Sequence, residues 1–139
     1  MGNDLVFDPG VSTGVALMAP GTVYWTKVVR KLLEVGDVFD FATLTEDVDR
    51  VVYEDYRIFP GKAAAHIGSQ VYPIQVIGVI RFLAYRHHLP VEVLEPSCKA
   101  YISKEEFAAV MPEKLPTEHE NDSVLLGLYQ QRRDALKKG

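Results

Sequence analysis

The sequence has a single cysteine, Cys98, and no apolar run long enough to cross a membrane. One cysteine excludes an internal disulfide and a zinc site built from several cysteine ligands. A transmembrane helix needs about 20 consecutive apolar residues, so no membrane span is predicted. The first residues also lack the basic start and apolar stretch of a signal peptide. We therefore expect a cytoplasmic protein without a membrane partner.

A basic balance is also absent, since the net charge is -4, with 15 lysine and arginine residues against 19 acidic residues. This argues mildly against a nucleic-acid binder, which usually carries a basic surface. The charges are unevenly distributed, however, with four cations within 132–138 and acids clustered at 46–55 and 113–122. An acidic metal site with basic flanks that contact phosphate would produce such a distribution.

The 139 residues suffice for one domain with its own core and not for two. Apolar, β-branched and aromatic runs predict strands at 5–8, 13–18, 22–29, 50–54 and 91–95. Helical patterns predict helices at 37–48, 72–87, 97–110 with a break near residue 103, and 121–137. The segment 57–69 is expected to be a loop or a poorly defined helix start, and Pro60-Gly61 favours the loop. Pro73 fits the first turn of its helix, where its missing N–H does no harm. The order β-β-β-α-β-α-β-α-α implies an α/β fold with a five-stranded mixed sheet, an antiparallel meander of three strands plus two more, flanked by helices.

Three acidic residues stand at the ends of these elements. Asp8 closes the first strand before Pro9-Gly10, and Glu54 closes the fourth strand. A carboxylate beside buried apolar residues is costly unless a cation pairs with it. Asp122 lies at the start of the last helix, which can pack on the sheet beside those strands. Three converging carboxylates suit Mg²⁺ or Mn²⁺, and two such ions about 4 Å apart can promote phosphodiester cleavage.

Each of these acids also has a purely structural interpretation. Asp8 fits an Asp-Pro-Gly turn, Glu54 an exposed strand end, and Asp122 a helix start favoured by the helix dipole. Gly10 and Gly14 fit turn geometry better than phosphate binding.

Four motifs, in this order, resemble those of RuvC-type Holliday-junction resolvases. They are Asp8-Pro9-Gly10-Val11-Ser12-Thr13-Gly14-Val15-Ala16, Val51-Val52-Tyr53-Glu54, Val93-Leu94-Glu95-Pro96-Ser97-Cys98-Lys99 and His119-Glu120-Asn121-Asp122-Ser123-Val124-Leu125-Leu126-Gly127. The resemblance covers nearly the whole chain. The compactness of this chain is similar to that of phage-encoded members of the family. A phage-encoded member would act in the cytoplasm of the bacterial host. The resemblance implies one RNase H-like nuclease domain over 1–139, a homodimer, and nicking of branched DNA such as four-way junctions.

The resemblance implies that Asp8, Glu54 and Asp122 bind two Mg²⁺ or Mn²⁺ ions and are catalytic. Bacterial members often have an acid where this sequence has His119, although some have histidine there. His119 is therefore predicted to bind metal or to transfer a proton near neutral pH. Glu118 and Glu120 are interpreted as solvated acids, although either could supplement the metal site.

Contacts to the DNA backbone are predicted for five cations, namely Lys99, Arg57, Lys62, Arg132 and Arg133. Tyr56 and Phe59 could stack on an unpaired base, and packing within the protein is an equal alternative. An affinity for DNA that depends on a few local cations should fall steeply as the salt concentration rises.

Residues 72–86 are apolar around most of the predicted helix, a pattern typical of a helix buried on two sides. In a small chain the second side can be another subunit, so we predict a homodimer through this helix. Packing within one subunit is the alternative.

Three other functions stay open. The first is a nuclease of the same fold that acts on flaps, forks or RNA–DNA hybrids. The second is an ATP-binding protein of the actin and sugar-kinase class, whose opening motif is similar, although that class needs two lobes. The third is a non-catalytic DNA-binding module of the same fold, against which the presence of all three acids argues.

Overall fold

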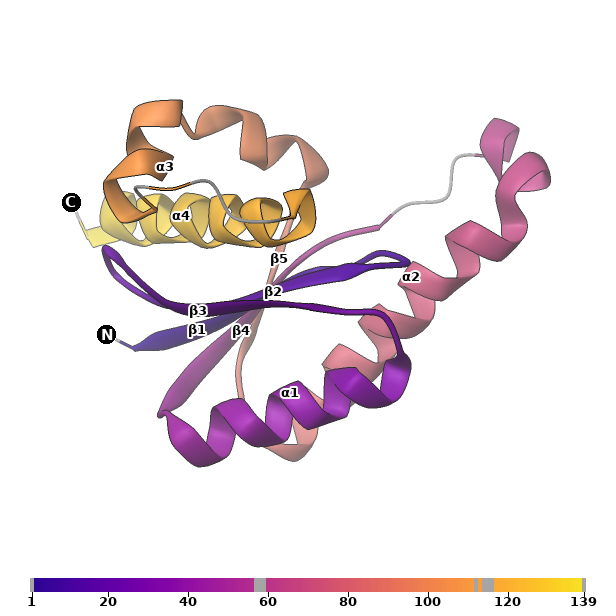
Figure 1. Ribbon diagram of the computed structural model, residues 1–139, viewed down its shortest axis with the longest axis horizontal. Helices are drawn as coiled ribbons and strands as arrows, with labels where there is room; N and C mark the ends of the chain where they lie inside the picture. Colours follow the sequence, from indigo (N-terminus) through magenta and orange to yellow (C-terminus); the bar gives the residue numbers. More distant parts are fainter. Residues whose placement is uncertain (1, 57–59, 112, 114–116, 139) are drawn as a thin grey trace.

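A five-stranded sheet lies between two layers of helices in the computed structural model, which describes residues 2–56, 60–111, 113 and 117–138 (Figure 1). For residues 60–71 and 138 the backbone alone is described. The strands are β1 (Asn3–Asp8), β2 (Thr13–Ala19), β3 (Thr22–Val29), β4 (Val48–Glu54) and β5 (Val91–Leu94). The helices are α1 (Leu32–Thr45), α2 (Pro60–Arg86), α3 (Lys104–Val110) and α4 (Glu118–Lys138), with a short 3-10 helix, η1 (Pro96–Tyr101). The predicted α/β fold with a mixed sheet of five strands is confirmed.

The strand order in the sheet is β3-β2-β1-β4-β5. The first three strands form the predicted antiparallel meander, in which Asp8 pairs with Gly14 and Thr13 pairs with Val29. The strands β1, β4 and β5 run parallel to one another. Because parallel strands end at the same edge of a sheet, the last residues of β1 and β4, Asp8 and Glu54, lie at one end of the molecule.

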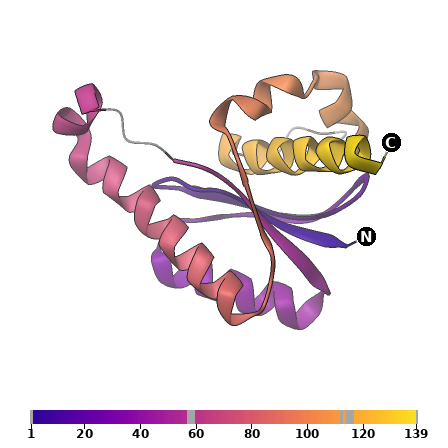
Figure 2. The same cartoon turned by 180° about the vertical axis from the view of Figure 1, so that it is seen from behind.

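Each face of the sheet has its own hydrophobic core, because side chains alternate between the two faces along each strand. Leu5 and Phe7 of β1 face the core shared with α1 and α2, whereas Val6 faces the core shared with α4. Two views of the ribbon agree that α1 and α2 lie side by side on one face and that α3 and α4 cover the other (Figures 1 and 2). Coverage of both faces explains why β1 and β2 consist of nearly continuous buried apolar runs.

The helix α4 packs closely on β2 because two glycines remove side chains from the contact. A Cβ atom at Gly14 would overlap the backbone carbonyl of His119, and one at Gly127 would overlap the side chain of Met18. Gly14 lies inside β2, so its interpretation as a turn residue was wrong. The close approach of a helix backbone, rather than a turn, requires glycine at this position.

Several predicted helix boundaries were wrong. The helix α2 begins at Pro60, so Pro60 and not Pro73 takes the position at the helix start. Of the two alternatives for 57–69, a loop or a helix start, the structure shows helix from residue 60 onwards. Three consecutive alanines at 63–65 favour helix, whereas Pro60-Gly61 favours a loop. The helix α1 spans Leu32–Thr45 instead of 37–48, because Val48 already belongs to β4.

The segment 97–110 is divided as predicted near Ser103. The 3-10 helix η1 ends at Tyr101, and Ser103 then caps α3 by accepting a hydrogen bond from the backbone N–H of Glu106. The helix α4 begins at Glu118, three residues earlier than predicted. Within the described ranges, no helix combines the length and apolar character that a membrane span requires.

Candidate active site

Three carboxylates from three separate elements meet at one end of the sheet. Asp8 ends β1 and Glu54 ends β4, and these strands are parallel neighbours. Asp122 comes from α4, where it is the fifth residue of the helix. It therefore lies beyond the first turn, and its position is not explained by a preference of acids for the helix start.

A fourth residue, Lys99 of η1, lies between these acids. Its Nζ atom is 2.9 Å from Glu54 Oε2, 3.5 Å from Asp122 Oδ2 and 3.7 Å from Asp8 Oδ1. The three carboxylates thus converge on one positive charge. We call Asp8, Glu54, Asp122 and Lys99 the acidic cluster.

The electrostatics of the acidic cluster are unbalanced, since three carboxylates face one ammonium. Burial, followed by the hydrogen bond with Glu54 and the nearby carboxylate charges, raises the pKa of Asp8 to about 8, although Lys99 opposes this shift. Burial alone would lower the pKa of the Lys99 ammonium, but the charges of Asp8, Glu54 and Asp122 outweigh it and raise that pKa. A further cation at this place would relieve the repulsion between the acids.

The donor set fits a divalent metal ion in chemistry and charge. Carboxylate oxygens are the ligands that Mg²⁺ and Mn²⁺ prefer. In the part of the chain that the structure describes, no three His, Cys, Asp or Glu side chains are placed so that they could hold a metal ion together. The Lys99 ammonium instead stands in for a cation among the acids, within 3.7 Å of each of them.

An open cavity of about 540 Å³ adjoins the acidic cluster. Its lining comes from the ends of β1 and β4 and from the start of η1, and includes Asp8, Glu54, Tyr56, Pro96 and Lys99. Tyr56 therefore lies in the cavity beside the acids, and its stacking on a base stays a prediction. Phe59 is outside the described residues. Cys98, next to Lys99, is buried, and burial raises the pKa of its thiol to about 11, so it is no nucleophile near neutral pH.

His119 lies in the first turn of α4 and is exposed. Among the described residues it shares no hydrogen bond or ion pair with Asp8, Glu54 or Asp122. Residues three apart share a helix face, so His119 is on the same side of α4 as Asp122, and its metal or proton-transfer role stays a prediction. Glu118 is exposed, as expected of a solvated acid, whereas Glu120 is half-buried and its carboxylate accepts hydrogen bonds from two threonines.

The cations predicted to contact DNA fall into different surroundings. Lys99 belongs to the acidic cluster, and Arg132 is tied to η1 and α3, because it donates to the Tyr101 carbonyl at 2.7 Å and pairs with Glu106. Arg133 is half-buried on α4. Arg57 lies outside the described residues, and so does the side chain of Lys62.

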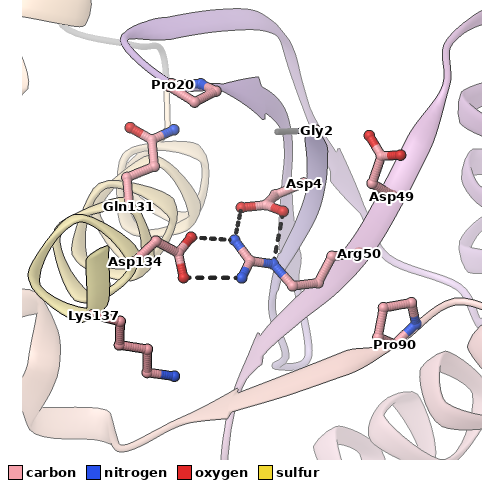
Figure 3. Close-up of a pocket in the computed structure, with 9 residues that line it drawn as sticks. All are labelled: Gly2, Asp4, Pro20, Asp49, Arg50, Pro90, Gln131, Asp134 and Lys137. Atoms are coloured by element: carbon pink, nitrogen blue, oxygen red, sulfur yellow. Dashed lines mark hydrogen bonds and ion pairs between the residues drawn. The ribbon is translucent and has the colours of Figure 1, made fainter. Parts of the chain in front are cut away.

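A second charged cluster lies at the opposite end of the same three elements (Figure 3). Arg50 of β4 pairs with Asp4 of β1 at 2.7 Å and with Asp134 of α4 at 2.6 Å. Its guanidinium donates two hydrogen bonds to each carboxylate, and Gln130 donates a further one to Asp134. We call Arg50, Asp4 and Asp134 the arginine cluster. Each carboxylate accepts two hydrogen bonds from the one guanidinium, so the arginine cluster is a structural feature and not a second candidate metal site.

Sequence reasoning missed two features of the end of the molecule that carries the acidic cluster. It predicted that Lys99 contacts DNA and did not anticipate its contacts with all three acids. The available signal was the strand β5, which lies parallel to β4 and directly precedes η1, so that η1 starts at the edge of the sheet where β4 ends. It also treated Glu120 as solvated and did not consider Thr26, which contacts it from β3. The Thr-x-x-Glu pattern at 117–120, typical of a helix start, was the available signal for Glu120.

The sheet order, the two helical layers and the acids at the ends of β1 and β4 define an RNase H-like fold. The same fold occurs in Holliday-junction resolvases. A structure of T. thermophilus RuvC in complex with Holliday junction substrate matches with a TM-score of 0.78 and 13% identity over 99% of this chain and 97% of that chain. A complex of the fowlpox virus resolvase with Holliday junction DNA matches with a TM-score of 0.62 and 13% identity, over 94% and 99% of the two chains.

The yeast mitochondrial Holliday junction resolvase Ydc2 matches with a TM-score of 0.58 and 13% identity, over 97% of this chain and 80% of that chain. No protein-family profile and no curated sequence matches. The predicted likeness to RuvC-type resolvases is thus confirmed at the level of the fold.

Proposed function

We propose that this protein is a metal-dependent endonuclease that nicks branched DNA, with four-way junctions as its principal substrate. The observation that carries this proposal is the convergence of Asp8, Glu54 and Asp122 on one cation at the end of the sheet. In the structural arginine cluster two acids share one guanidinium, which donates two hydrogen bonds to each of them. Three acids from β1, β4 and α4 around a single ammonium suit a site that binds further positive charge.

In this proposal Asp8, Glu54 and Asp122 hold Mg²⁺ or Mn²⁺, and His119 supplements them from the same side of α4. When bound, the metal supplies Lewis-acid chemistry for phosphodiester hydrolysis, either as one ion or as a pair. The three acids hold their positions without a ligand. Asp8 and Glu54 stand at the ends of parallel strands, and Asp122 lies inside a helix that packs on β2. Their mutual repulsion is the property that favours the cation.

Lys99 has two features that suit a role beside the scissile phosphate. Its ammonium balances part of the charge of the acids, and 23% of its side chain is exposed towards the cavity that Tyr56 also lines. A cation at this place can bind a phosphate oxygen that enters the cavity. Arg57, Lys62 and Arg133 remain proposed backbone contacts, whereas the ties of Arg132 to Tyr101 and Glu106 make it a weaker candidate.

The proposed substrate is supported by the similar structures, two of which are complexes with Holliday junction DNA. This chain covers nearly the full length of both of those proteins, so no substrate-binding domain of theirs lies outside the match. Two nicks in a four-way junction require two active sites held in a fixed relation, which a twofold dimer provides.

The exposed face of α2 supports a homodimer. Ile74, Phe82 and Tyr85 are 42%, 58% and 80% exposed and, with the exposed Gly78, follow one face of the helix at spacings of three and four residues. Glycine at the centre of this stripe allows a second helix to approach. Phe82→Asp should give a monomer in sedimentation equilibrium, whereas Leu136→Asp, on the opposite helical layer, should leave the dimer intact. A wild-type monomer would refute this part of the proposal.

A panel of labelled substrates tests the proposed activity. Four-way junction, fork, flap, RNA–DNA hybrid and linear duplex are incubated with the protein and Mg²⁺ or Mn²⁺, and with EDTA as the control. We expect cleavage of the junction first and fastest, and none in EDTA. Preferential cleavage of the hybrid or the flap would assign the same site to another substrate. Inactivity on every substrate with both metals would favour a non-catalytic DNA-binding module.

A further inference from the structure

We propose that Glu120 is a positioning residue, which fixes Asp122 in the active site by tethering the start of α4 to the strand β3 through Thr26. This inference rests on the proposed function, because it assigns Asp122 to the metal site. It concerns a residue that neither binds the metal nor touches the DNA.

Both carboxylate oxygens of Glu120 are engaged. Thr26 of β3 donates its hydroxyl to Oε2 at 2.5 Å, and Thr117 donates its hydroxyl to Oε1 at 2.9 Å. The backbone N–H of Glu120 in turn donates to the Thr117 hydroxyl at 3.2 Å. Glu120 makes no ion pair with Lys99, which contacts Asp8, Glu54 and Asp122 instead. Its oxygens therefore serve the helix and the strand, and not the acidic cluster.

The direction of this tether suits the placement of Asp122. Successive helix residues are rotated by about 100°, so side chains two apart leave the axis in nearly opposite directions. Glu120 reaches the edge strand β3, while Asp122 reaches the central strands β1 and β4 through the shared contact with Lys99. A bond on one side of the helix thus fixes the rotation that aims Asp122 on the other side.

The backbone of α4 is held at the same point. Gly14 of β2 leaves room for the carbonyl of His119 only because it lacks a side chain. Gly14 also pairs with Asp8 across the sheet. The close contact at Gly14 sets the distance of α4 from the sheet, and the hydrogen bond between Glu120 and Thr26 sets its rotation.

The helix α3 provides an internal comparison. It begins with the pattern Ser103-x-x-Glu106, in which the carboxylate of Glu106 returns to the backbone N–H of Ser103 at 3.1 Å. The other carboxylate oxygen of Glu106 pairs with Arg132 of α4, so it ties α3 to that helix. The helix α4 begins with the related pattern Thr117-x-x-Glu120, where one carboxylate oxygen stays with Thr117 and the other extends to the strand β3. In both helices one oxygen serves the first turn and the other ties the helix to a neighbouring element, which for Glu120 is the edge strand of the sheet.

Four variants separate positioning from metal binding. Thr26→Val removes the donor at constant shape and Glu120→Ala removes the acceptor, whereas Thr26→Ser and Glu120→Gln retain groups that can form the tether. Ser103→Ala is the matched control, because it removes a helix cap whose hydroxyl bonds to the backbone of α3. Mn²⁺ affinity is measured by electron paramagnetic resonance without DNA, and the Mn²⁺ concentration for half-maximal junction cleavage is measured in parallel.

We expect Thr26→Val and Glu120→Ala to weaken Mn²⁺ binding roughly 10-fold, the low end of the effect of residues that orient metal ligands. Thr26→Ser, Glu120→Gln and Ser103→Ala should remain close to wild type. Wild-type affinity in Thr26→Val and Glu120→Ala would overturn the inference. So would an equal loss in Glu120→Gln and Glu120→Ala, which would make Glu120 a metal ligand. If wild type itself neither bound Mn²⁺ nor cleaved the junction, the proposed function would fail.

Discussion

The acidic cluster and the arginine cluster are built from the same three elements, β1, β4 and α4, and differ in the balance of their charges. On β1 and β4 the corresponding residues are four apart, Asp4 and Asp8 on one strand and Arg50 and Glu54 on the other, so they share one face of the sheet. At one end a guanidinium matches two carboxylates. At the other end glutamate replaces the arginine, and a lysine from η1 faces three acids.

The difference shows how one scaffold can produce both stability and a reactive site. The two hydrogen bonds from Arg50 to each acid fix the geometry and leave little need for a ligand. Arg50 is also the main cause that lowers the pKa of Asp134, whereas burial of Asp4 outweighs its arginine bonds and raises the pKa of that acid. In the acidic cluster the compact Lys99 ammonium cannot satisfy three acids in this way, and the pKa of Asp8 rises to about 8.

The largest effect should follow from neutralising an acid at the active end. Glu54→Gln or Asp122→Asn should reduce junction cleavage to background, because each removes a proposed metal ligand. The matched control is Asp4→Asn, which changes the same kind of group on β1 at the other end and should retain cleavage. Equal loss of cleavage in Asp4→Asn would show that the two ends do not differ as proposed.

The next effect concerns the stability supplied by the arginine cluster. Arg50→Met leaves Asp4 buried without its partner, and we expect the free energy of unfolding in urea to fall by about 2 kcal/mol. The loss is placed below the usual range for buried ion pairs because the side chains of Arg50 and Asp134 are 21% and 29% exposed. The triple variant Arg50→Met, Asp4→Leu, Asp134→Leu should recover much of this loss. An unchanged urea midpoint for Arg50→Met would contradict this account.

The third effect is a pH-dependent gain of stability in Asp8→Asn. The pKa of Asp8 is about 8 in the folded protein against a usual value of 3.8, so the folded state binds more protons than the unfolded state between these values. The stability of wild type should therefore fall as the pH rises from 4 to 8, and the full cost of ionised Asp8 is present above pH 8.

This gain is measured as the melting temperature of Asp8→Asn minus that of wild type, in EDTA. The difference should be near zero at pH 4 and should grow through pH 8, at about 4 °C for each kcal/mol in a chain of this size. Asp134→Asn is the control, because Arg50 lowers the pKa of Asp134 and neutralising that acid should not raise the melting temperature at pH 8. A difference for Asp8→Asn that is constant with pH would refute the assignment of the titration to Asp8.

The smallest effect is expected for Glu118→Gln. Glu118 is exposed in the first turn of α4, near His119 and Asp122 in sequence, and contacts neither the acidic cluster nor Thr26 in the described residues. Its neutralisation should leave both the rate of cleavage and the Mn²⁺ requirement close to those of wild type. A strong increase in the required Mn²⁺ would show that Glu118 joins the metal site.

The sequence was sufficient to predict the five strands of the sheet and the positions of two acids at the ends of strands. The β-branched and aromatic runs predicted all five strands, and Asp8 and Glu54 were recognisable because each carboxylate directly follows buried apolar residues. Asp122 depended on resemblance, because an acid inside an amphipathic helix looks like any other surface acid. The helix boundaries failed where local signals compete, as at Pro60-Gly61 before the alanines of α2.

The remaining features depend on contacts between distant parts of the chain. The hydrogen bond between Thr26 and Glu120 joins residues 94 positions apart, and that between Arg50 and Asp134 joins residues 84 apart. No local pattern encodes such pairs. The contacts of Lys99 likewise require β5 to lie beside β4, which fixes where η1 begins. The need for glycine at Gly14 becomes visible only when α4 is placed on β2.

The most direct test of the central claim is cleavage of a mobile four-way junction by wild type and by Asp8→Asn, side by side, in Mn²⁺. We predict symmetric paired nicks by wild type, and no nicks by Asp8→Asn although that variant folds and still binds the junction. Nicking by Asp8→Asn at the wild-type rate would contradict the assignment of the acidic cluster as the active site.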